Sequence, residues 1–317
     1  MTSKIKTYFS LLKSAASEFS LDNATKLSAS LAYYTVFSIG PLLLVIVTVA
    51  GIFFKPSDIT LNVYNQMKSL IGKDGAEQVQ LILTNISGQS STTLLGIIGL
   101  IILISGATGV FIEIQTSINY IWSIRAKPKK GWLKFLTDRL LSFSLILGIG
   151  FLLIVSLLVN ALMDALTGRL VHFFGDANVI LFKIISVIVL FCVISVLFAV
   201  IYKVLPDAKI YWKDSFVGAT FTGLLFLIGK FLIGVYLGNS KLGATYGTAA
   251  SIIVLLSWVY YSAIILYFGA EFTKVYALKL GKGIQPYKNA VFIVKREAKE
   301  LPGETHPTDN PANRQHL

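Results

Sequence analysis

The sequence has little charge, one cysteine and three histidines. Charged residues make up 14% of the 317 residues, whereas a soluble globular domain carries roughly 25%. Cys192 lies inside an apolar run, so the chain alone forms neither a disulfide framework nor a cysteine-based zinc site. A Walker loop, a GxSxG elbow and an HExxH helix are also missing. These absences argue against the common nucleotide-binding, hydrolase and zinc-protease classes.

Long apolar runs are what the sequence has instead. Hydrophobic residues make up 55% of the chain, and the mean hydropathy is +0.72. Several runs are long enough to cross the ~30 Å hydrocarbon core of a bilayer as helices. They cover residues 27–54, 94–122, 140–163, 179–202, 216–237 and 246–276. The sequence therefore predicts an all-α polytopic membrane protein with six transmembrane helices.

The segments outside these runs have patterns of their own. Residues 1–26 combine lysines with apolar residues at helical spacing, which predicts an amphipathic N-terminal helix on the cytoplasmic membrane surface. Residues 55–92 repeat apolar residues every three or four positions, which predicts a helical external loop. Residues 281–317 form a polar cytoplasmic tail that is rich in proline from Lys295 onward, so we expect this tail to be disordered.

Basic residues are distributed unevenly between the loops. The chain holds 28 Lys and Arg against 16 Asp and Glu, for a net charge of +12. Of the basic residues outside the spans, 21 lie on the side that holds both termini and five lie on the other side. The positive-inside rule therefore predicts that both termini are cytoplasmic. The expected partners are membrane lipids, with anionic headgroups at the cytoplasmic loops, and no specific nucleic acid is expected.

Small residues are frequent in two of the predicted spans. The run 216–237 and the residue after it contain Gly234 and Gly238 as a GxxxG pair, and the run 94–122 is also rich in glycine. Small residues let membrane helices approach closely, because helices in lipid lack a hydrophobic drive to associate. Packing within the chain and formation of a homo-oligomer both explain this pattern.

Few ionisable or amide side chains lie inside the apolar runs, and they define a candidate polar core. A charge in hydrocarbon costs several kcal/mol unless it faces a partner or water. Glu113 and Lys230 are the deepest opposite charges, and a long lysine side chain could bridge the distance between them. A structural ion pair or polar packing, a substrate or proton path, and contact with water at the membrane interface all stay open. The candidate residues are Glu113, Lys230, Asn119, Glu271, Tyr33 and Tyr34.

Acidic residues outside the spans do not suggest a catalytic centre. Asp138, Asp207 and Asp214 are scattered and flanked by Lys or Arg, as solvated loop charges usually are. A metal-dependent nuclease needs acids and histidines that converge on one side of the membrane. We therefore expect no enzyme activity, no catalytic or metal-binding residues and no cofactor.

Five stretches of the sequence resemble a known family. They are LAYYTVFSIGPLLL from Leu31, INYIW from Ile118, YKVLP from Tyr202, WKDSFVGA from Trp212 and YGTAASIIVLLSWVYYSAIILYFGAEF from Tyr246. In order and spacing they resemble the YihY/BrkB family of bacterial inner-membrane proteins, some of which were once labelled ribonuclease BN. The resemblance covers roughly residues 10 to 280. It implies a multi-pass inner-membrane protein with six helices and cytoplasmic termini, and it supplies no established catalytic or binding residues.

Three functions from different classes are compatible with these features. A transporter, or an envelope protein that translocates lipids or solutes, predicts polar groups that converge between the spans. A structural or scaffolding envelope protein predicts that those groups pair off. A ribonuclease predicts a cytoplasmic cluster of acids. The sequence favours transport, keeps the scaffold as the alternative and disfavours the ribonuclease.

Overall fold

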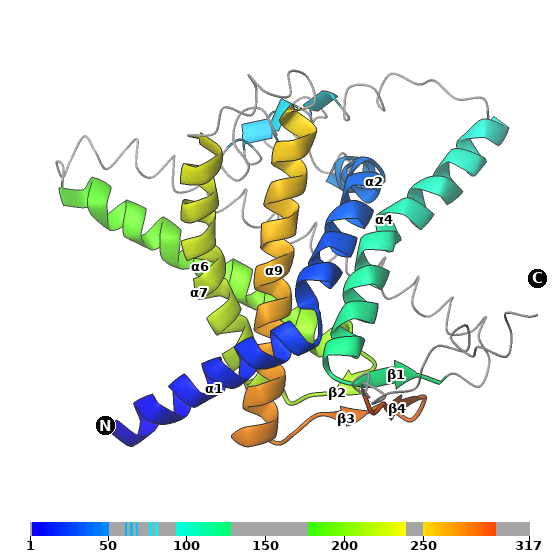
Figure 1. Cartoon of the computed structure of the whole chain (residues 1–317). Helices are drawn as coiled ribbons and strands as arrows, with labels where there is room; N and C mark the ends of the chain where they lie inside the picture. Colours follow the sequence, from blue (N-terminus) through cyan, green and yellow to red (C-terminus); the bar gives the residue numbers. More distant parts are fainter. Residues whose placement is uncertain are drawn as a thin grey trace, which may run out of the picture.

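The computed structural model describes residues 2–50, 93–127, 177–238 and 250–295, with a few further residues between 61 and 81. Within these residues the fold is mainly helical (Figure 1). The long helices are α1 Thr2–Leu21, α2 Ala24–Ala50, α4 Thr93–Ile121, α6 Ala177–Val204, α7 Trp212–Gly238 and α9 Ala250–Lys279. Short strands follow three of them: β1 Ile124–Ala126, β2 Ala208–Lys209, β3 Gln285–Pro286 and β4 Ala290–Phe292.

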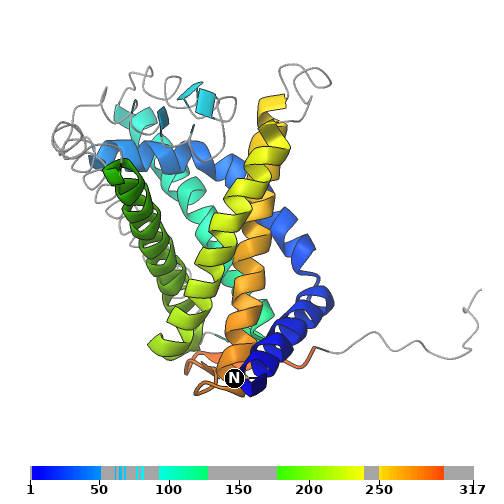
Figure 2. The ribbon, with the colours of Figure 1, turned by 90° about the vertical axis from the view of Figure 1, so that its left-hand side faces the viewer.

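Helix α9 is the centre of the arrangement. It contacts α1, α2, α4 and α7, while α2 packs on α4 and α6 packs on α7. Helix α1 crosses α9 near one end of the assembly (Figures 1 and 2). A Cβ atom added at Gly218 of α7 would overlap the side chain of Thr273, and one added at Gly269 of α9 would overlap Thr222. Gly218 lies in one of the glycine-rich runs noted in the sequence, so at least this glycine serves close helix packing within the chain.

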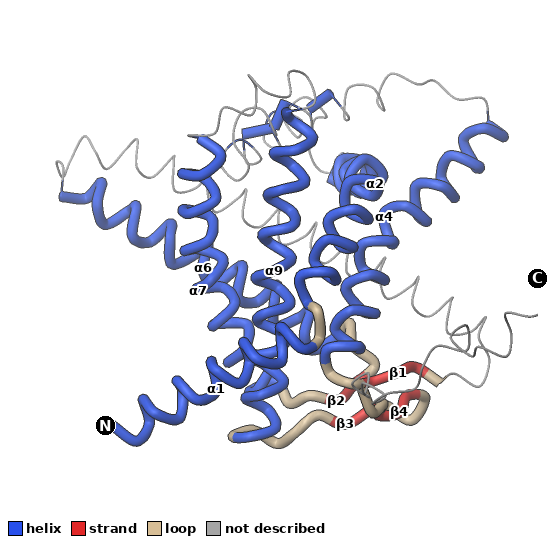
Figure 3. The backbone as a smooth tube through the Cα atoms, in the orientation of Figure 1, coloured by secondary structure: helices blue, strands red, loops and turns tan. Residues whose placement is uncertain are grey.

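All four strands lie at one end of the helices, which we call the strand end (Figure 3). Strand β1 pairs antiparallel with β4, and β2 pairs antiparallel with β3. The chain after α9 thus returns to the loops that follow α4 and α6. Gly283 makes this return possible with a φ of 80°, a backbone conformation that glycine adopts without strain. Its N–H donates to the Ala277 carbonyl at 2.9 Å and so caps the end of α9.

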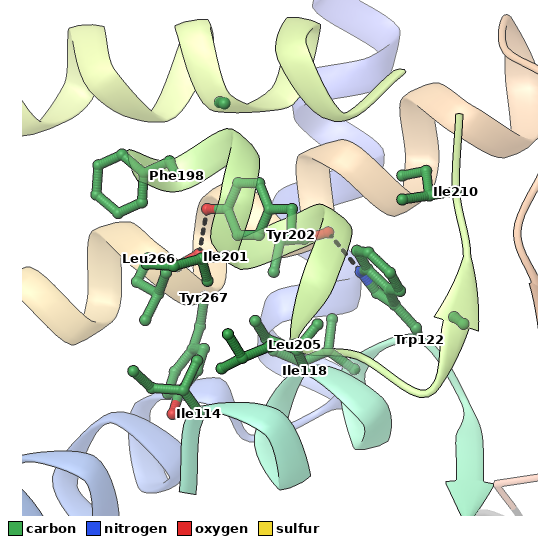
Figure 4. Packing of buried hydrophobic residues seen from close by; sticks show 14 of the residues in the cluster. Ile114, Ile118, Trp122, Phe198, Ile201, Tyr202, Leu205, Ile210, Leu266 and Tyr267 are labelled. Carbon is green, nitrogen blue, oxygen red and sulfur yellow. Dashed lines mark hydrogen bonds between the residues drawn. The ribbon is translucent and has the colours of Figure 1, made fainter. Parts of the chain in front are cut away.

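A buried hydrophobic cluster lies next to the strand end (Figure 4). Most of its members come from α4, α6 and α9, and the others come from α2, α7 and the segments around the strands. Tyr202 is fully buried, and its hydroxyl donates to the Leu266 carbonyl at 2.8 Å. The indole N–H of Trp122 donates to the Ala270 carbonyl at 3.1 Å. The large aromatic side chains thus bury their rings and satisfy their polar atoms at the same time.

Five of the predicted spans correspond to helices in the structure. Runs 27–54, 94–122, 179–202, 216–237 and 246–276 match α2, α4, α6, α7 and α9. The remaining run, 140–163, and nearly all of the predicted external loop helices lie outside the described residues. Three described helices contain windows long and apolar enough to cross a membrane: Val187–Val204, Trp212–Ile233 and Ile252–Lys279. The total of six spans stays a prediction.

Two expectations about the ends of the helices need correction. The all-α class omitted the four strands, because each is only two or three residues long and pairs with a segment far away in the sequence. The disorder expected from residue 281 does not apply to 281–295. There, backbone pairing with β1 and β2 supplies hydrogen bonds that polar composition does not reveal. Residues 296–317 lie outside the described residues.

Candidate functional site

Five charged side chains meet at the strand end, and we call them the charge cluster. They are Glu18 of α1, Asp22 directly after α1, Glu271 and Lys274 of α9, and Lys295 after β4. The Lys274 Nζ atom lies 2.9 Å from Glu18 Oε2, 2.8 Å from Glu271 Oε2 and 3.6 Å from Asp22 Oδ2. Lys295 forms an ion pair with Asp22. Three carboxyl groups therefore share two ammonium groups.

Burial differs strongly within the cluster. The side chains of Glu271, Asp22 and Lys274 are 0%, 4% and 8% exposed, whereas those of Lys295 and Glu18 are 23% and 43% exposed. Glu271 therefore lies at the closed inner side and Glu18 at the side that faces solvent. A buried ion pair is costly to form, because each charge gives up its hydration.

The end of α4 completes the surroundings of the two lysines. Lys274 donates to the Ile121 carbonyl at 2.9 Å, and Lys295 approaches the same oxygen at 3.4 Å. The last carbonyls of a helix lack partners within the helix and carry the negative end of its dipole, so they suit ammonium groups. The Lys295 Nζ atom also lies 4.4 Å from the ring centroid of Tyr120. The charge cluster thus joins α1, α4, α9 and the segment after β4.

The spacing of the cluster residues along the chain places them on shared faces of their helices. Glu18 and Asp22 are four residues apart, and Glu271 and Lys274 are three apart, so each pair lies on one face of a helical turn. Helix α1 ends just beyond, where the Asp22 N–H donates to the Glu18 carbonyl at 2.8 Å. Asn23 then takes a φ of 50°, a left-handed conformation that asparagine tolerates well. This turn directs the chain from α1 into α2.

Burial affects two groups of the cluster, Lys295 and Glu271, in different ways. Burial lowers the pKa of Lys295, and the hydrogen bond and charge of Asp22 oppose that change. The Glu271 Oε2 atom faces Lys274, but Glu271 Oε1 has no hydrogen-bond partner among the described residues. Buried polar atoms nearly always have a partner, so this oxygen needs an explanation.

Glu271 is the one residue of the charge cluster that the sequence marks as a candidate. The spacing of Glu18 and Asp22 was visible, but it is also the ordinary spacing of a solvated helix face. Glu18 and Lys274 are 256 positions apart in the chain. No local pattern could indicate that contact.

The acids that we interpreted as solvated loop charges have structural partners. The Asn119 side-chain amide donates to Asp207 Oδ2 at 2.8 Å, and the Asp207 backbone N–H donates to Asn119 Oδ1 at 2.8 Å. Asp214 is buried and accepts the Lys282 N–H at 3.1 Å. The interpretation was wrong for Asp207 and Asp214, because the fold provides donors from distant segments. Asp138 lies outside the described residues.

The six candidate polar-core residues do not form one site. Glu271 belongs to the charge cluster, and Asn119 pairs with Asp207. Tyr33 and Tyr34 are exposed on α2, with ring centroids 6.0 Å apart. Their functional roles stay predictions.

The two deepest charges of the candidate polar core lie on different helices. Glu113 is on α4 and Lys230 is on α7, and both are partly buried. No ion pair joins them in the described part of the chain, and α9 contacts both of their helices. An ion pair between these residues was part of one of three explanations of their depth, and the observed arrangement gives it no support.

The three acids of the charge cluster are close enough to suggest a metal site. Glu18, Asp22 and Glu271 can each offer one oxygen, and these atoms lie within 4.8 Å of one another. However, the Lys274 ammonium contacts all three carboxyl groups. A metal ion would have to displace this ammonium, so the set fits a metal poorly.

Comparison with known proteins places these features in a family. The family model described as "Virulence factor BrkB" matches residues 15–292. The chain is similar to a UPF0761 membrane protein of Tolumonas auensis, with 30% identity over 193 residues, which is 59% of each chain. A UPF0761 membrane protein of Alteromonas mediterranea is 26% identical over 259 residues, covering 80% of this chain and 82% of that protein.

Other relatives differ in name and in coverage. A ribonuclease-like protein of Bacillus subtilis, YfkH, is 26% identical over 267 residues, covering 83% of this chain and 93% of that protein. The similar stretch covers only 59% and 47% of the relatives from Tolumonas auensis and Verminephrobacter eiseniae. No solved structure matches the chain. The matched residues include Glu18, Asp22, Glu271 and Lys274 and the motifs noted in the sequence. The chain is a membrane protein that belongs to the BrkB family.

Proposed function

We propose that this protein is a transporter that moves lipids or solutes across the bacterial inner membrane, and that the charge cluster closes its cytoplasmic end. The observation that carries the proposal is the position of Glu271. This acid lies in a helix with membrane-spanning character, is fully buried and leaves one oxygen without a partner among the described residues. Ionisable groups in membrane spans are expensive and commonly mark substrate or ion pathways.

We further propose that the strand end and both termini face the cytoplasm. The 21-to-5 distribution of basic residues supports this orientation. Helix α1 also exposes Tyr8, Phe9 and Leu12 beside Lys6 and Lys13, a combination suited to the headgroup region of anionic lipids. Cysteine labelling in a Cys192→Ser background tests the orientation. Cysteine at Lys288 should react only after permeabilisation, and cysteine at Asn239 should react in intact cells. The reverse pattern would contradict the proposed orientation.

Transport is best tested with the purified protein in proteoliposomes. Vesicles containing fluorescently labelled phosphatidylglycerol report lipid movement when an external reductant bleaches the outer leaflet, and vesicles loaded with small solutes report release. Wild-type protein should accelerate one of these processes, and Glu271→Gln should change that rate. Asp214→Asn is the matched control, because Asp214 is a buried acid at the same end but outside the charge cluster. Vesicles that match protein-free vesicles in both assays would contradict transport.

A scaffolding protein is the alternative, and the satisfied polar groups favour it. Lys274 has four close oxygen partners, and Asn119 and Asp207 bond reciprocally. Glu113 and Lys230 distinguish the two functions. If they line a path, the combined variant Glu113→Leu and Lys230→Leu should fold but fail to complement a deletion strain. A stable double variant with full complementation would favour the scaffold.

We propose that the protein does not cleave RNA, although a cluster of acids exists. Asp22 and Glu271 are buried, and the acids already contact lysines, so a phosphodiester has no free carboxylate pair to approach. Purified protein supplied with Mg²⁺ or Mn²⁺ should leave RNA intact, and any RNA binding should fall steeply with salt. Metal-dependent cleavage that disappears in Asp22→Asn would overturn this proposal.

A further inference from the structure

We propose that the charge cluster binds one proton, shared between the carboxyl groups of Glu271 and Asp22. The proton site is argued from the geometry of the cluster. Its use as the coupling ion of transport rests on the proposed function.

The charges of the cluster do not cancel. Three carboxyl groups face two ammonium groups, so one negative charge is left over when every group is ionised. Glu271 and Asp22 are buried, and a buried carboxylate without its own counter-charge becomes neutral more easily than it stays charged. One proton restores the balance of the cluster.

An oxygen of Glu271 without a partner in the described part of the chain points to the same site, independently of the charges. Glu271 Oε1 is buried and has no hydrogen-bond partner among the described residues, while Oε2 faces Lys274. A proton on Glu271 turns this carboxyl group into a hydrogen-bond donor. Glu271 and Asp22 can place oxygens within 4.8 Å of each other, and Asp22 is the acid that we propose as the acceptor. We place the proton on Glu271, with Asp22 as the group that shares it through this hydrogen bond.

The charged groups around Glu271 come from every segment that meets there. Helix α1 and the turn after it supply Glu18 and Asp22, α9 supplies Lys274, and the segment after β4 supplies Lys295. Helix α4 supplies the Ile121 carbonyl, which accepts from Lys274. No ion pair links these side chains to another charged group in the described part of the chain. Within this ion-paired set of described residues, one negative charge is therefore in excess.

The cluster also has a side through which a proton can enter. Glu18 is 43% exposed, and its carboxylate contacts the Lys274 ammonium, which in turn contacts Glu271. Glu18 therefore marks the side of the cluster that is nearest to water, and we place the entry of the proton on this side. A metal ion fits less well, because the Lys274 ammonium already lies among the three acids.

Infrared difference spectroscopy of the full chain in nanodiscs tests the proton directly. Spectra are compared between mildly acidic and alkaline buffers that contain no sodium, potassium or divalent ions. We expect a carboxylic acid carbonyl band that decreases as pH rises. The band should disappear in Glu271→Gln and persist in Asp214→Asn, the matched buried acid outside the cluster.

Variants that change the charge count test the mechanism further. Glu18→Gln should also remove the band, because two acids would then face two lysines. Glu18 is partly exposed, so this variant keeps the test usable if Glu271→Gln does not fold. Lys295→Met should increase the band, because a second carboxyl group then lacks a counter-charge.

Three results would overturn the proton site. The first is that the wild type shows no band, and the second is that the band survives in both Glu271→Gln and Glu18→Gln. The third is that the wild-type band vanishes when Na⁺ or Mg²⁺ is added at constant pH. The last result would identify a bound cation instead. A normal band without any lipid or solute flux would contradict the transport proposal and support the proton site. Flux without the band would contradict the proton site alone.

Discussion

The two ends of the described helices are built on different principles. At the strand end, residues such as Ile121, Tyr202 and Ala277 are completely buried, and polar groups pair with partners from other segments. Toward the opposite end, apolar side chains point outward: Val187 and Ile188 of α6 are each 54% exposed, and Phe231 of α7 is 70% exposed. Figure 1 shows α4 and α6 converging at the strand end and diverging away from it.

This difference follows from what surrounds each end. Apolar side chains that face lipid need no protein core, because hydrocarbon satisfies them as well as a core does. Buried charges need exact partners, because an unpaired charge away from water is costly. The strand end should therefore be sensitive to single substitutions, and the outward apolar surface should tolerate them.

The largest effect is expected at Lys274. Lys274→Met leaves three acids with one ammonium group, and breaking a buried ion pair from one side typically costs about 3–5 kcal/mol. The measurement is the free energy or midpoint of unfolding in a mild detergent. Lys279→Met is the matched control, because Lys279 lies on the same helix and bonds only to Ser14 at the surface. Equal decreases of the unfolding free energy in the two variants would show that the charge cluster stabilises the fold no more than a surface contact does.

A smaller effect is expected at the contact between α7 and α9. A Cβ atom at Gly269 would overlap Thr222 and the Tyr202 hydroxyl, so Gly269→Ala should destabilise by about 1–3 kcal/mol through overpacking. Gly109→Ala is the control, because the nearest atom to its added methyl group would be Ser38 Oγ at 3.2 Å. Unfolding midpoints that fall equally in both variants would contradict the tight contact.

The pH dependence of stability sharpens the comparison further. If the native cluster holds a proton that the unfolded chain releases, stability falls as pH rises, by about 1.4 kcal/mol per pH unit between the unfolded and folded titrations. As pH rises above the unfolded glutamate pKa of about 4.3, the unfolding midpoint of the wild type should therefore fall relative to that of Glu271→Gln, which lacks this proton. Lys295 does not mimic this trend: its pKa is lowered, so its own contribution makes stability rise with pH, and only near the alkaline range. Parallel midpoint curves for the two proteins would contradict the prediction.

The smallest effect is expected on the outward apolar surface. Phe231→Ala removes a ring that is 70% exposed and leaves no cavity inside the protein, so its unfolding midpoint should move by the equivalent of about 0.5 kcal/mol or less. Gly269→Ala serves as the comparison from the packed region. A loss at Phe231 as large as that at Gly269 would show that another part of the protein packs against this surface.

Much of the helical architecture could be predicted because its cause is local. A run of about 20 apolar residues forms a helix in a membrane regardless of its neighbours, since backbone groups must be satisfied within the segment. For this reason α6, α7 and α9 were predicted to within a few residues, and the family could be identified from motifs inside and next to the long helices. The helix expected in residues 1–26 is present for a similar reason, because its apolar spacing is local.

Only the tertiary structure decided where the polar residues act. Asp207 and Asp214 resemble solvated loop charges in the sequence, yet a backbone turn and a distant asparagine give them partners. The strands after α9 are too short to show a period of their own, and their partners are the loops after α4 and α6. The charge cluster joins Glu18 to Lys274 across 256 positions of the chain. Hydropathy and spacing describe a residue's neighbours along the chain, whereas a buried charge depends on neighbours in space, which only the folded chain supplies.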